Sequence, residues 1–380
     1  NGEAFKAALA KVGNVISFVD KKNEIYDASK VVIPVANWLE SWGDIAPQTG
    51  VYALTQPTIQ KVFKARQLEE SLLVWINGKN NAANNYYNYL KANAATLLNG
   101  ASFNQALYNG INESGAAGTL SYVGGDAATA LAGLGKFASS KLELALYTNT
   151  AIGDGTQGNN PWLQELPDPI TRLAWDNYLT ISPKDAKELG IENDLNARMQ
   201  LDGDKVNVTV NGVTIKDVPV FIQPGQAQGS VGLALGYGKK NSGKVAETGI
   251  NAYPFFDGSN LVLSNVTIEK TGDMHEFAGM QLQSTLMGRY DIAKEVSLEN
   301  FINVPFDDAK NGWNKPLEYH TINGALPARK IDLWDSFDDT DGPHFNLSID
   351  LNSCTGCGAC VIACNAENNV PVVGKEELRM

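Results

Sequence analysis

The sequence has few cysteines and histidines, and it has no long hydrophobic run. Its 380 residues include 4 cysteines and 3 histidines, and no stretch approaches the roughly 18 consecutive apolar residues of a transmembrane helix. The first 340 residues contain no cysteine, no HExxH pattern and no Ser/His/Asp order. These absences argue against a hydrolytic or zinc-protease site and against a membrane span within this sequence.

Positive charge is also scarce relative to negative charge. There are 42 acidic and 30 basic residues, so the formal net charge is -12 and the pI is near 4.8. Because nucleic acids and anionic membranes are bound by clustered basic faces, neither is expected as a partner. A hydrophobic content of 43% indicates a globular protein, and the length allows two or three domains, each with its own core.

All the cysteines of the chain lie in one short window near the C-terminal end of the sequence. The run CTGCGACVIAC has the spacing C-x2-C-x2-C-x3-C, which is the spacing of iron-sulfur ligands in bacterial ferredoxins. The predicted cofactor and metal ligands are therefore Cys354, Cys357, Cys360 and Cys364.

The spacing of this motif suits a [4Fe-4S] cluster. Two intervening residues let the chain curl around the cluster, and Gly356 and Gly358 relieve crowding because they have no Cβ. In the two-cluster pattern the first three cysteines bind one cluster and the fourth binds its neighbour. We therefore predict three ligands of one cluster and one ligand of a second cluster.

Two alternative uses of the cysteines fit less well. Structural zinc sites usually combine two ligand pairs separated by a longer spacer, and the sequence has no second pair. Disulfides between cysteines this close would need strained loops. Since two clusters need eight thiolates, the remaining ligands are expected beyond Met380 or in separate chains, and the sequence is expected to be a piece of a longer polypeptide that also extends before Asn1.

The first 151 residues alternate short apolar runs with amphipathic stretches, which predicts an α/β domain. Residues 31–35 (VVIPV) are typical of a buried strand, and residues 142–147 (LELALY) predict a further strand. Residues 57–77 have an apolar period near 3.6 and predict a helix, and a second helix is expected over residues 83–98.

Residues 152–169 are rich in Gly, Pro, Asn and Asp and predict a linker, and residues 170–270 predict a small β-barrel with one helix. Ser182 and Pro183 are typical of a helix start, and Gly190 of its end. Hairpin turns are expected at Asp202-Gly203 and Asn211-Gly212, and strands at residues 197–201, 205–210, 213–215, 218–222 and 231–235.

Residues 271–343 lose this periodicity and predict an extended linker on a partner surface. Residues 345–351 (FNLSIDL) alternate apolar and polar side chains directly before the first cysteine, which predicts a strand. Residues 344–380 are therefore interpreted as the start of a ferredoxin-like iron-sulfur domain.

The barrel segment resembles the dinucleotide-binding C-terminal domain of molybdopterin oxidoreductases, a double-psi barrel. The resemblance rests on residues 174–178 (AWDNY), 182–190 (SPKDAKELG), 205–210 and 224–238 (PGQAQGSVGLALGYG). Residues 31–50 look like the late part of the main domain of the same family. This resemblance implies a molybdopterin-oxidoreductase-like α/β domain followed by a double-psi barrel.

The fusion of such a barrel to a ferredoxin motif is similar to the large iron-sulfur subunit of alternative complex III, and residues 344–380 carry the closest resemblance. Asn365 follows the last cysteine where small bacterial ferredoxins have proline, which favours the four-cluster respiratory type. The resemblance implies [4Fe-4S] clusters and a [3Fe-4S] cluster in the parent subunit, and a molybdopterin-like part without molybdopterin. An active molybdopterin oxidoreductase with a fused ferredoxin domain, and a structural subunit with inert clusters, remain alternatives.

The same resemblance implies a role and a location. The chain would carry electrons from quinol toward cytochrome partners within a membrane-associated respiratory complex. Its partners would be haem c proteins, quinol-oxidising membrane subunits, and a terminal oxidase or cytochrome acceptor. It would lie at the periplasmic side of the bacterial inner membrane.

Several other motifs are expected to be structural. Residues 238–244 (GKKNSGK) match G-x4-G-K, but Val245 stands where a P-loop has Ser or Thr, so an ordinary surface loop is expected. His275, His320 and His344 lack ligand spacing and are expected at solvent or interface positions. Asp350 is expected to cap a turn beside the cysteines.

Overall fold

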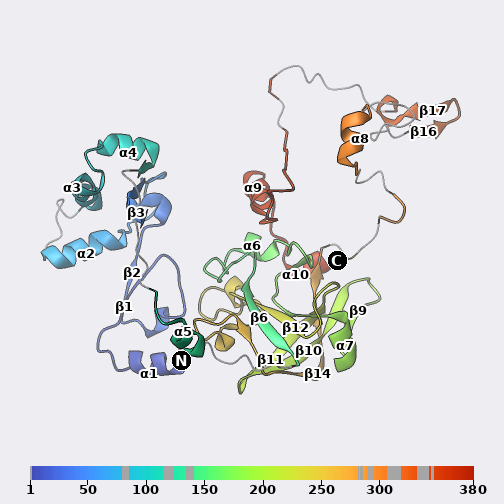
Figure 1. Ribbon diagram of the computed structural model, residues 1–380, viewed down its shortest axis with the longest axis horizontal. Helices are drawn as coiled ribbons and strands as arrows, with labels where there is room; N and C mark the ends of the chain where they lie inside the picture. The colour runs from blue at the N-terminus through green and yellow to red at the C-terminus, as the bar shows by residue number, and fades with distance from the viewer. Residues whose placement is uncertain are drawn as a thin grey trace. The chain divides into compact units, whose positions relative to one another are not determined.

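The computed structural model describes residues 2–78, 85–113, 124–133, 141–280, 282, 286–289, 295–305, 318–331, 342–343 and 346–380 (Figure 1). The chain divides into two units, one made of Asn1–Ala278 with Gly358–Met380 and the other of Gly279–Cys357. The cysteine motif crosses this division, so each half of it is described within its own unit. The predicted domain boundaries at residues 151, 169, 270 and 343 stay predictions.

An eight-stranded mixed sheet is the largest element of the first unit, in the order β13-β6-β12-β8-β11-β10-β14, with β9 paired to β10. β6 runs parallel to β12 and β8 parallel to β11, whereas the other pairings are antiparallel. The fold is therefore mixed α/β, and closure of the sheet into a double-psi barrel stays a prediction. Its strands are β6 (Glu143–Thr148), β8 (Leu179–Ile181), β9 (Asn193–Leu195), β10 (Leu201–Val210), β11 (Val213–Ile222), β12 (Ser230–Leu235), β13 (Val262–Leu263) and β14 (Val266–Glu276).

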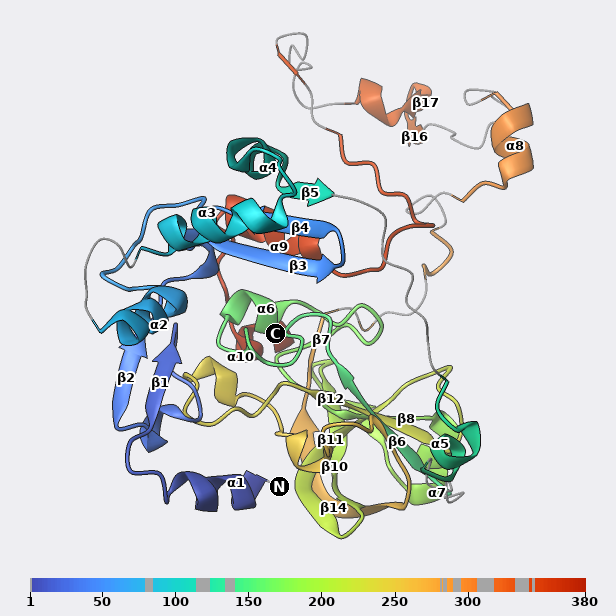
Figure 2. The same ribbon diagram turned by 60° about the vertical axis from the view of Figure 1, so that its left-hand side comes forward.

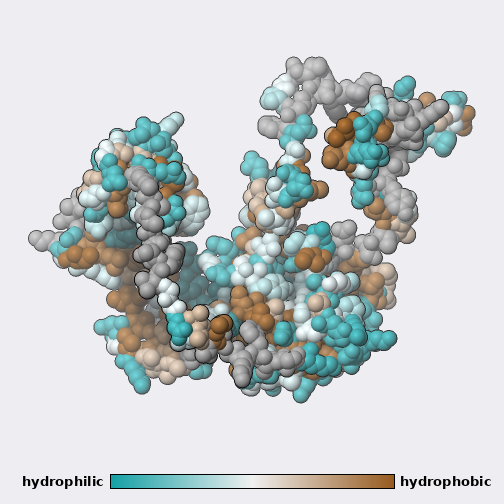
Figure 3. Space-filling model, viewed as in Figure 1, coloured by the Kyte–Doolittle hydropathy of each residue, from teal (hydrophilic) through white to brown (hydrophobic). Residues whose placement is uncertain are grey.

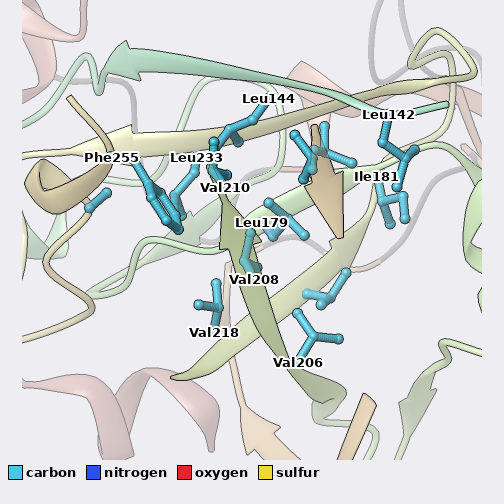
Figure 4. Close-up of a cluster of buried hydrophobic side chains, with 14 of the residues drawn as sticks. Leu142, Leu144, Leu179, Ile181, Val206, Val208, Val210, Val218, Leu233 and Phe255 are labelled. Carbon is cyan, nitrogen blue, oxygen red and sulfur yellow. The ribbon is translucent and has the colours of Figure 1, made fainter. Parts of the chain in front are cut away.

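The main hydrophobic core lies within this sheet (Figure 4). Alternate residues of β10 point inward because successive side chains of a strand face opposite sides. Burial of these aliphatic side chains supplies the main stabilising free energy of the unit, at about 25 cal/mol per Å² of apolar surface. Fully buried members include Leu144, Leu179, Ile181, Val206, Val208, Val218, Val220, Val231 and Leu233.

The predicted helix after residue 182 is confirmed as α7 (Pro183–Leu189). The Ser182 hydroxyl accepts a hydrogen bond from the Asp185 amide, and Pro183 occupies the first helical position. Gly190 ends the helix in the left-handed conformation, which glycine adopts without a Cβ penalty. These residues at the two ends of the helix were sufficient to predict its bounds, because each acts only on neighbouring residues.

Other local predictions for the sheet are partly wrong. The turn at Asn211-Gly212 is confirmed, with both residues at positive φ. Asp202-Gly203 instead lies inside β10, where a Cβ on Gly203 would come within 2.6 Å of the Phe277 ring. Residues 197–201 are a turn followed by the first residue of β10, and residues 213–222 form the single strand β11.

The N-terminal part of this unit contains two smaller sheets. β1 (Ile16–Val19) pairs in parallel with β2 (Val31–Pro34), which confirms a strand at the predicted place. The predicted burial is wrong, because no residue of β2 is buried. A second sheet has the order β3-β4-β5, and α3 and α4 pack on it around buried Tyr52, Leu90 and Ala94 (Figure 2). Their bounds are β3 (Gly43–Gln48), β4 (Val51–Thr55), β5 (Ile111–Glu113), α3 (Tyr86–Leu97) and α4 (Phe103–Asn109).

The helix predicted over residues 57–77 is too long, because α2 spans only Leu68–Asn77. The preceding segment is held to other backbone: the buried Glu40 carboxylate accepts a hydrogen bond from the Val62 amide at 2.9 Å. Thr58 N donates to Leu39 O at 2.9 Å. In these long-range hydrogen bonds, backbone amides are used that would otherwise donate to carbonyl groups within a helix. The helix predicted over residues 83–98 is confirmed as α3 from Tyr86 onward.

The predicted linker at residues 152–169 contains a short helix, α6 (Pro161–Glu165), capped by the Asn160 side chain. β14 extends to Glu276, beyond the predicted start of the next linker, because it pairs along most of β10. The remaining elements of this unit are α1 (Gly2–Leu9), α5 (Ala127–Gly133), β7 (Leu173–Ala174), α9 (Ala359–Glu367) and α10 (Lys375–Arg379); β15 (Ala278–Gly279) pairs with β7.

The second unit, Gly279–Cys357, contains little regular structure among its described residues. It has α8 (Leu298–Asn303) and a hairpin of β16 (Glu318–Thr321) and β17 (Gly324–Pro327). Apolar side chains of α8 are exposed (Figure 3). The strand predicted at residues 345–351 is wrong where the structure describes it, since residues 346–350 have no strand pairing.

Short 3-10 helices complete the fold: η1 (Tyr26–Ala28), η2 (Trp38–Glu40), η4 (Val245–Glu247), η5 (Tyr253–Phe255) and η7 (Ala328–Lys330). None of the helices in the described ranges is both long and apolar enough to cross a membrane.

The position of Leu179 in the core of the sheet predicts that the Leu179→Ala substitution strongly lowers the free energy of unfolding. Leu179 is fully buried, and truncation of a buried leucine costs about 2–5 kcal/mol. We expect a loss of that size in the free energy of unfolding, measured by denaturant titration followed by circular dichroism. Leu195→Ala is the matched control because Leu195 is 48% exposed; equal losses in the two variants would contradict the assignment of the core.

The partly buried Tyr147 predicts a loss of stability at alkaline pH. Burial raises the pKa of Tyr147 to about 12, with a smaller contribution from Asp168. The neutral phenol is favoured in the fold, so its stabilisation is complete below about pH 10 and is lost as the pH rises toward 12. Tyr147→Phe should flatten the fall of unfolding free energy over this window, whereas Tyr108→Phe, at an exposed position, should not. Parallel curves for the wild type and Tyr147→Phe would refute this.

Candidate iron-sulfur site and its anchoring segment

Asp350 organises the loop before Cys354, as the sequence predicts. Its carboxylate accepts hydrogen bonds from the Ser353 hydroxyl and the Asn352 amide, both at 2.9 Å. These bonds lower the pKa of Asp350 below its ordinary value, the Ser353 hydroxyl contributing most. The Asp350 carbonyl accepts a hydrogen bond from Cys354 N at 2.9 Å, which fixes the backbone of the first cysteine.

The two glycines of the motif adopt a conformation that side chains disfavour. Gly356 and Gly358 both have φ of 70°, in the left-handed region that glycine enters without penalty. Gly358 is the N-cap of α9, and a Cβ there would lie 3.0 Å from a methyl group of Leu166. The backbone of the motif therefore bends at the positions where the sequence places glycine.

The last two cysteines lie on α9. Cys360 and Cys364 are four residues apart and so occupy neighbouring positions on one face of the helix. All the cysteines are free and exposed. Among the described residues, no group of three or more His, Cys, Asp or Glu side chains is arranged to hold a metal ion, so ligation by Cys354, Cys357, Cys360 and Cys364 stays a prediction.

The donor chemistry of these residues nevertheless fits an iron-sulfur cluster. Thiolates are the soft ligands that hold such clusters, and exposed thiols are accessible to iron and sulfide. Asn368, at the C-terminal end of α9, donates from its side-chain nitrogen to the Cys364 carbonyl at 2.9 Å and to the Cys364 sulfur at 3.5 Å. A polar group of this kind close to a ligand can orient it and alter its electronic properties.

The segment after α9 is bound to α6 and to the sheet. The Trp162 indole donates to the Val370 carbonyl at 2.9 Å. The Glu165 carboxylate accepts hydrogen bonds from the backbone amides of Val373, at 3.1 Å, and Gly374, at 2.9 Å. It also accepts one from the Trp175 indole at 3.2 Å. These bonds hold residues 370–374 beside α6.

Asp176 forms the next anchor. Its buried carboxylate lies 2.6 Å from the Lys375 ammonium group and 3.0 Å from His275 Nε2. His275 is therefore a largely buried partner of two charged groups, so the solvent position is wrong for it, whereas the interface position stays a prediction. His320 is exposed on β16, as predicted for solvent, whereas His344 lies outside the described residues.

Arg379 forms the most buried anchor, with a side chain 4% exposed. Its guanidinium group lies 2.9 Å from an Asp202 carboxylate oxygen and donates to the Phe277 carbonyl at 3.3 Å. Gln200 donates in turn to the Arg379 carbonyl at 2.8 Å. α10 is thereby fixed to β10 and to the residue that follows β14.

Two segments identified from the sequence have structural roles. The Asn177 side chain is buried and bonds the Ala234 carbonyl and both the carbonyl and amide of Ile250, so it joins β12 to the loop after it. Residues 238–244 are followed by the three-residue helix η4 rather than by the α-helix of a P-loop. This agrees with the interpretation of an ordinary loop.

Sequence reasoning identified the cysteines but missed the anchors. Asp176 stands in a run of buried residues, and a carboxylate in such a run requires a partner. A buried carboxylate therefore predicts that a cationic partner exists, but it does not identify the partner. Lys375, the partner in the structure, follows almost 200 residues later in the chain. Asn368 gave no signal beyond its place four residues after Cys364.

No protein-family model matches the chain. Over 26 residues the chain is 62% identical to the iron-sulfur cluster-binding subunit of menaquinone reductase from Nitratidesulfovibrio vulgaris. These residues make up 7% of this chain and 10% of that protein. The chain thus matches a tenth of the length of this curated relative.

Among solved structures, acetylene hydratase from Pelobacter acetylenicus aligns with a TM-score of 0.43 and 12% sequence identity. The alignment covers 65% of this chain and 38% of that chain. A likeness of this degree supports no inference about function. Sequence similarity therefore links the chain to an iron-sulfur subunit over a short segment only.

The Arg379 anchor predicts that Arg379→Met releases α10. Removal of the guanidinium group leaves Asp202, which is 22% exposed and keeps a hydrogen bond from Asn196 at 3.2 Å, so we expect a loss of about 1–3 kcal/mol in the free energy of unfolding. Amide hydrogen exchange in residues 375–379 should accelerate, as measured by mass spectrometry. Glu3→Gln, which removes an exposed Lys6–Glu3 pair, is the control and should leave the exchange in α10 unchanged, because exposed ion pairs contribute little to stability. Unchanged exchange in α10 would show that the pair does not hold it.

Proposed function

We propose that this chain is an iron-sulfur electron-transfer subunit of a quinol-oxidising respiratory complex. The observation that carries the proposal is the run of four cysteines with ferredoxin spacing, on free and exposed thiols. Cys354, Cys357 and Cys360 bind one [4Fe-4S] cluster, and Cys364 contributes one ligand to a second cluster. The clusters supply one-electron chemistry, and no residue of the chain acts as a catalytic acid, base or nucleophile in this role.

The residues of the chain position the ligands and set their surroundings. Asp350 holds the backbone at Cys354, and the left-handed glycines bend the loop. α9 carries Cys360 and Cys364 one turn apart. The anchors of the following segment keep α9 against α6, so the second half of the motif has a fixed support. A rigid support limits the reorganisation of the ligands when charge changes.

The membership of a quinone-linked complex is supported by the relative named above, a subunit of menaquinone reductase. We propose that quinol oxidised in a membrane subunit donates the electrons and that haem c proteins receive them on the way to a terminal oxidase or cytochrome acceptor. The parent subunit then holds further [4Fe-4S] clusters and a [3Fe-4S] cluster, at the periplasmic side of the bacterial inner membrane. The mixed sheet acts as a scaffold without molybdopterin.

Substitution of the cysteines tests this proposal. In the full-length protein purified with its complex, Cys354→Ser, Cys357→Ser and Cys360→Ser should each remove or convert one cluster, because serine is a poor replacement for a soft thiolate ligand. Iron content should fall, and the electron paramagnetic resonance signal of that cluster should disappear. Cys364→Ser should affect a different signal.

Thr355→Ser changes the same loop but leaves every thiol in place, so it should retain the iron and the signals. Iron content and spectra that are unchanged in all the cysteine variants would contradict cluster ligation. Clusters that are present but are not reduced by a quinol would support inert structural clusters instead. Stoichiometric molybdenum in the purified complex would favour an active molybdopterin oxidoreductase.

A further inference from the structure

Asn368 makes two hydrogen bonds to one cysteine. Its side-chain Nδ2 lies 2.9 Å from the Cys364 carbonyl oxygen and 3.5 Å from the Cys364 sulfur. An amide nitrogen carries two hydrogens, so one can serve each acceptor. The four-residue spacing at the end of α9 places the two residues on the same face of the helix, one turn apart.

The orientation of the Asn368 amide follows from the chemistry of both acceptors. If the amide were turned over, its oxygen would face a carbonyl oxygen and a thiolate, and neither can donate a hydrogen bond to it. The Cys364 carbonyl also accepts the Asn368 backbone amide at 3.0 Å, which ends the helix. The shared carbonyl therefore holds the side chain in place and directs its second N–H toward the sulfur.

The anchors after α9 keep this end of the helix in position. Val370 N donates to the Asn365 carbonyl at 3.0 Å, and the Val370 carbonyl accepts the Trp162 indole. Glu165 then binds the amides of Val373 and Gly374. The residues on both sides of Asn368 are thus tied to the first unit, so the hydrogen bond to sulfur does not have to be formed by ordering a loose segment.

We propose that Asn368 raises the reduction potential of the cluster bound by Cys364, acting through its hydrogen bond to the ligand sulfur. The inference rests on the proposed function, since it requires a cluster at Cys364. Reduction adds one electron to the cluster, and part of the added negative charge resides on its sulfur ligands. A hydrogen bond to sulfur is stronger in that state and therefore favours reduction. Asn368 is thus a residue that tunes the site through a ligand.

The proposal predicts a lower midpoint potential in the Asn368→Ala variant. Because the pair is exposed to solvent, we expect at most about a tenfold decrease in the equilibrium constant for reduction, which corresponds to about 59 mV for a one-electron couple. Asn368→Asp removes the donor and adds negative charge, so it should lower the potential at least as far. The measurement is a dithionite titration of the full-length protein with assembled clusters, followed by electron paramagnetic resonance.

Asn365→Ala is the matched control, because Asn365 lies on the same helix and its side chain makes no hydrogen bond to sulfur among the described residues. Its midpoint potential should equal that of the wild type. A second measurement separates tuning from folding: electron-nuclear double resonance should show an exchangeable proton coupled to the cluster in the wild type and not in Asn368→Ala. Far-ultraviolet circular dichroism verifies that the helix is retained.

Each failure has a distinct meaning. A wild-type protein without iron-sulfur signals would overturn the proposed function, and the inference with it. Assembled clusters with the same potential in Asn368→Ala and the wild type would overturn the inference alone. A potential that falls in Asn368→Asp but not in Asn368→Ala would show that the cluster responds to charge at this position and not to the hydrogen bond, which also overturns it.

Discussion

The ion pair of Arg379 with Asp202 is the interaction on which the placement of the C-terminal segment depends. A guanidinium group that is almost fully buried has to be matched by acceptors, because an unpaired charge in the interior costs several kcal/mol. Asp202 in β10 and the carbonyl of Phe277, the residue after β14, supply those acceptors. The position of α10 is therefore determined by the sheet, and the segment that leads back to α9 is restricted in turn.

Acidic side chains of the first unit supply the other anchors. Glu165 binds backbone amides, and Asp176 binds Lys375 and His275. Each of these carboxylates has fixed partners on the C-terminal segment, which contributes specificity as well as stability. The excess of acidic residues seen in the sequence therefore includes some that act inside the protein, although the net charge alone does not distinguish these from surface residues.

The parts of the structure that could be predicted are those determined by neighbouring residues. Ser182, Pro183 and Gly190 bounded α7 because caps act over one turn. The cysteine spacing predicted the candidate site without knowledge of the fold. Binding of a cluster by these cysteines stays a prediction. Asp202-Gly203 failed as a turn because pairing of β10 with β14 and β9 outweighed the local turn preference. The anchoring contacts could not be predicted for a related reason: the periodicity of a sequence carries no information on contacts between residues as far apart as 176 and 375.

The contacts of the C-terminal segment follow the same order along both parts of the chain that they join. Trp162, Glu165, Asp176 and Asp202 meet Val370, Val373, Lys375 and Arg379 in turn. The series begins at a partly exposed indole and ends at an almost fully enclosed guanidinium group. Because the order is the same on both sides, the C-terminal segment runs along residues 162–202 in a single direction without doubling back.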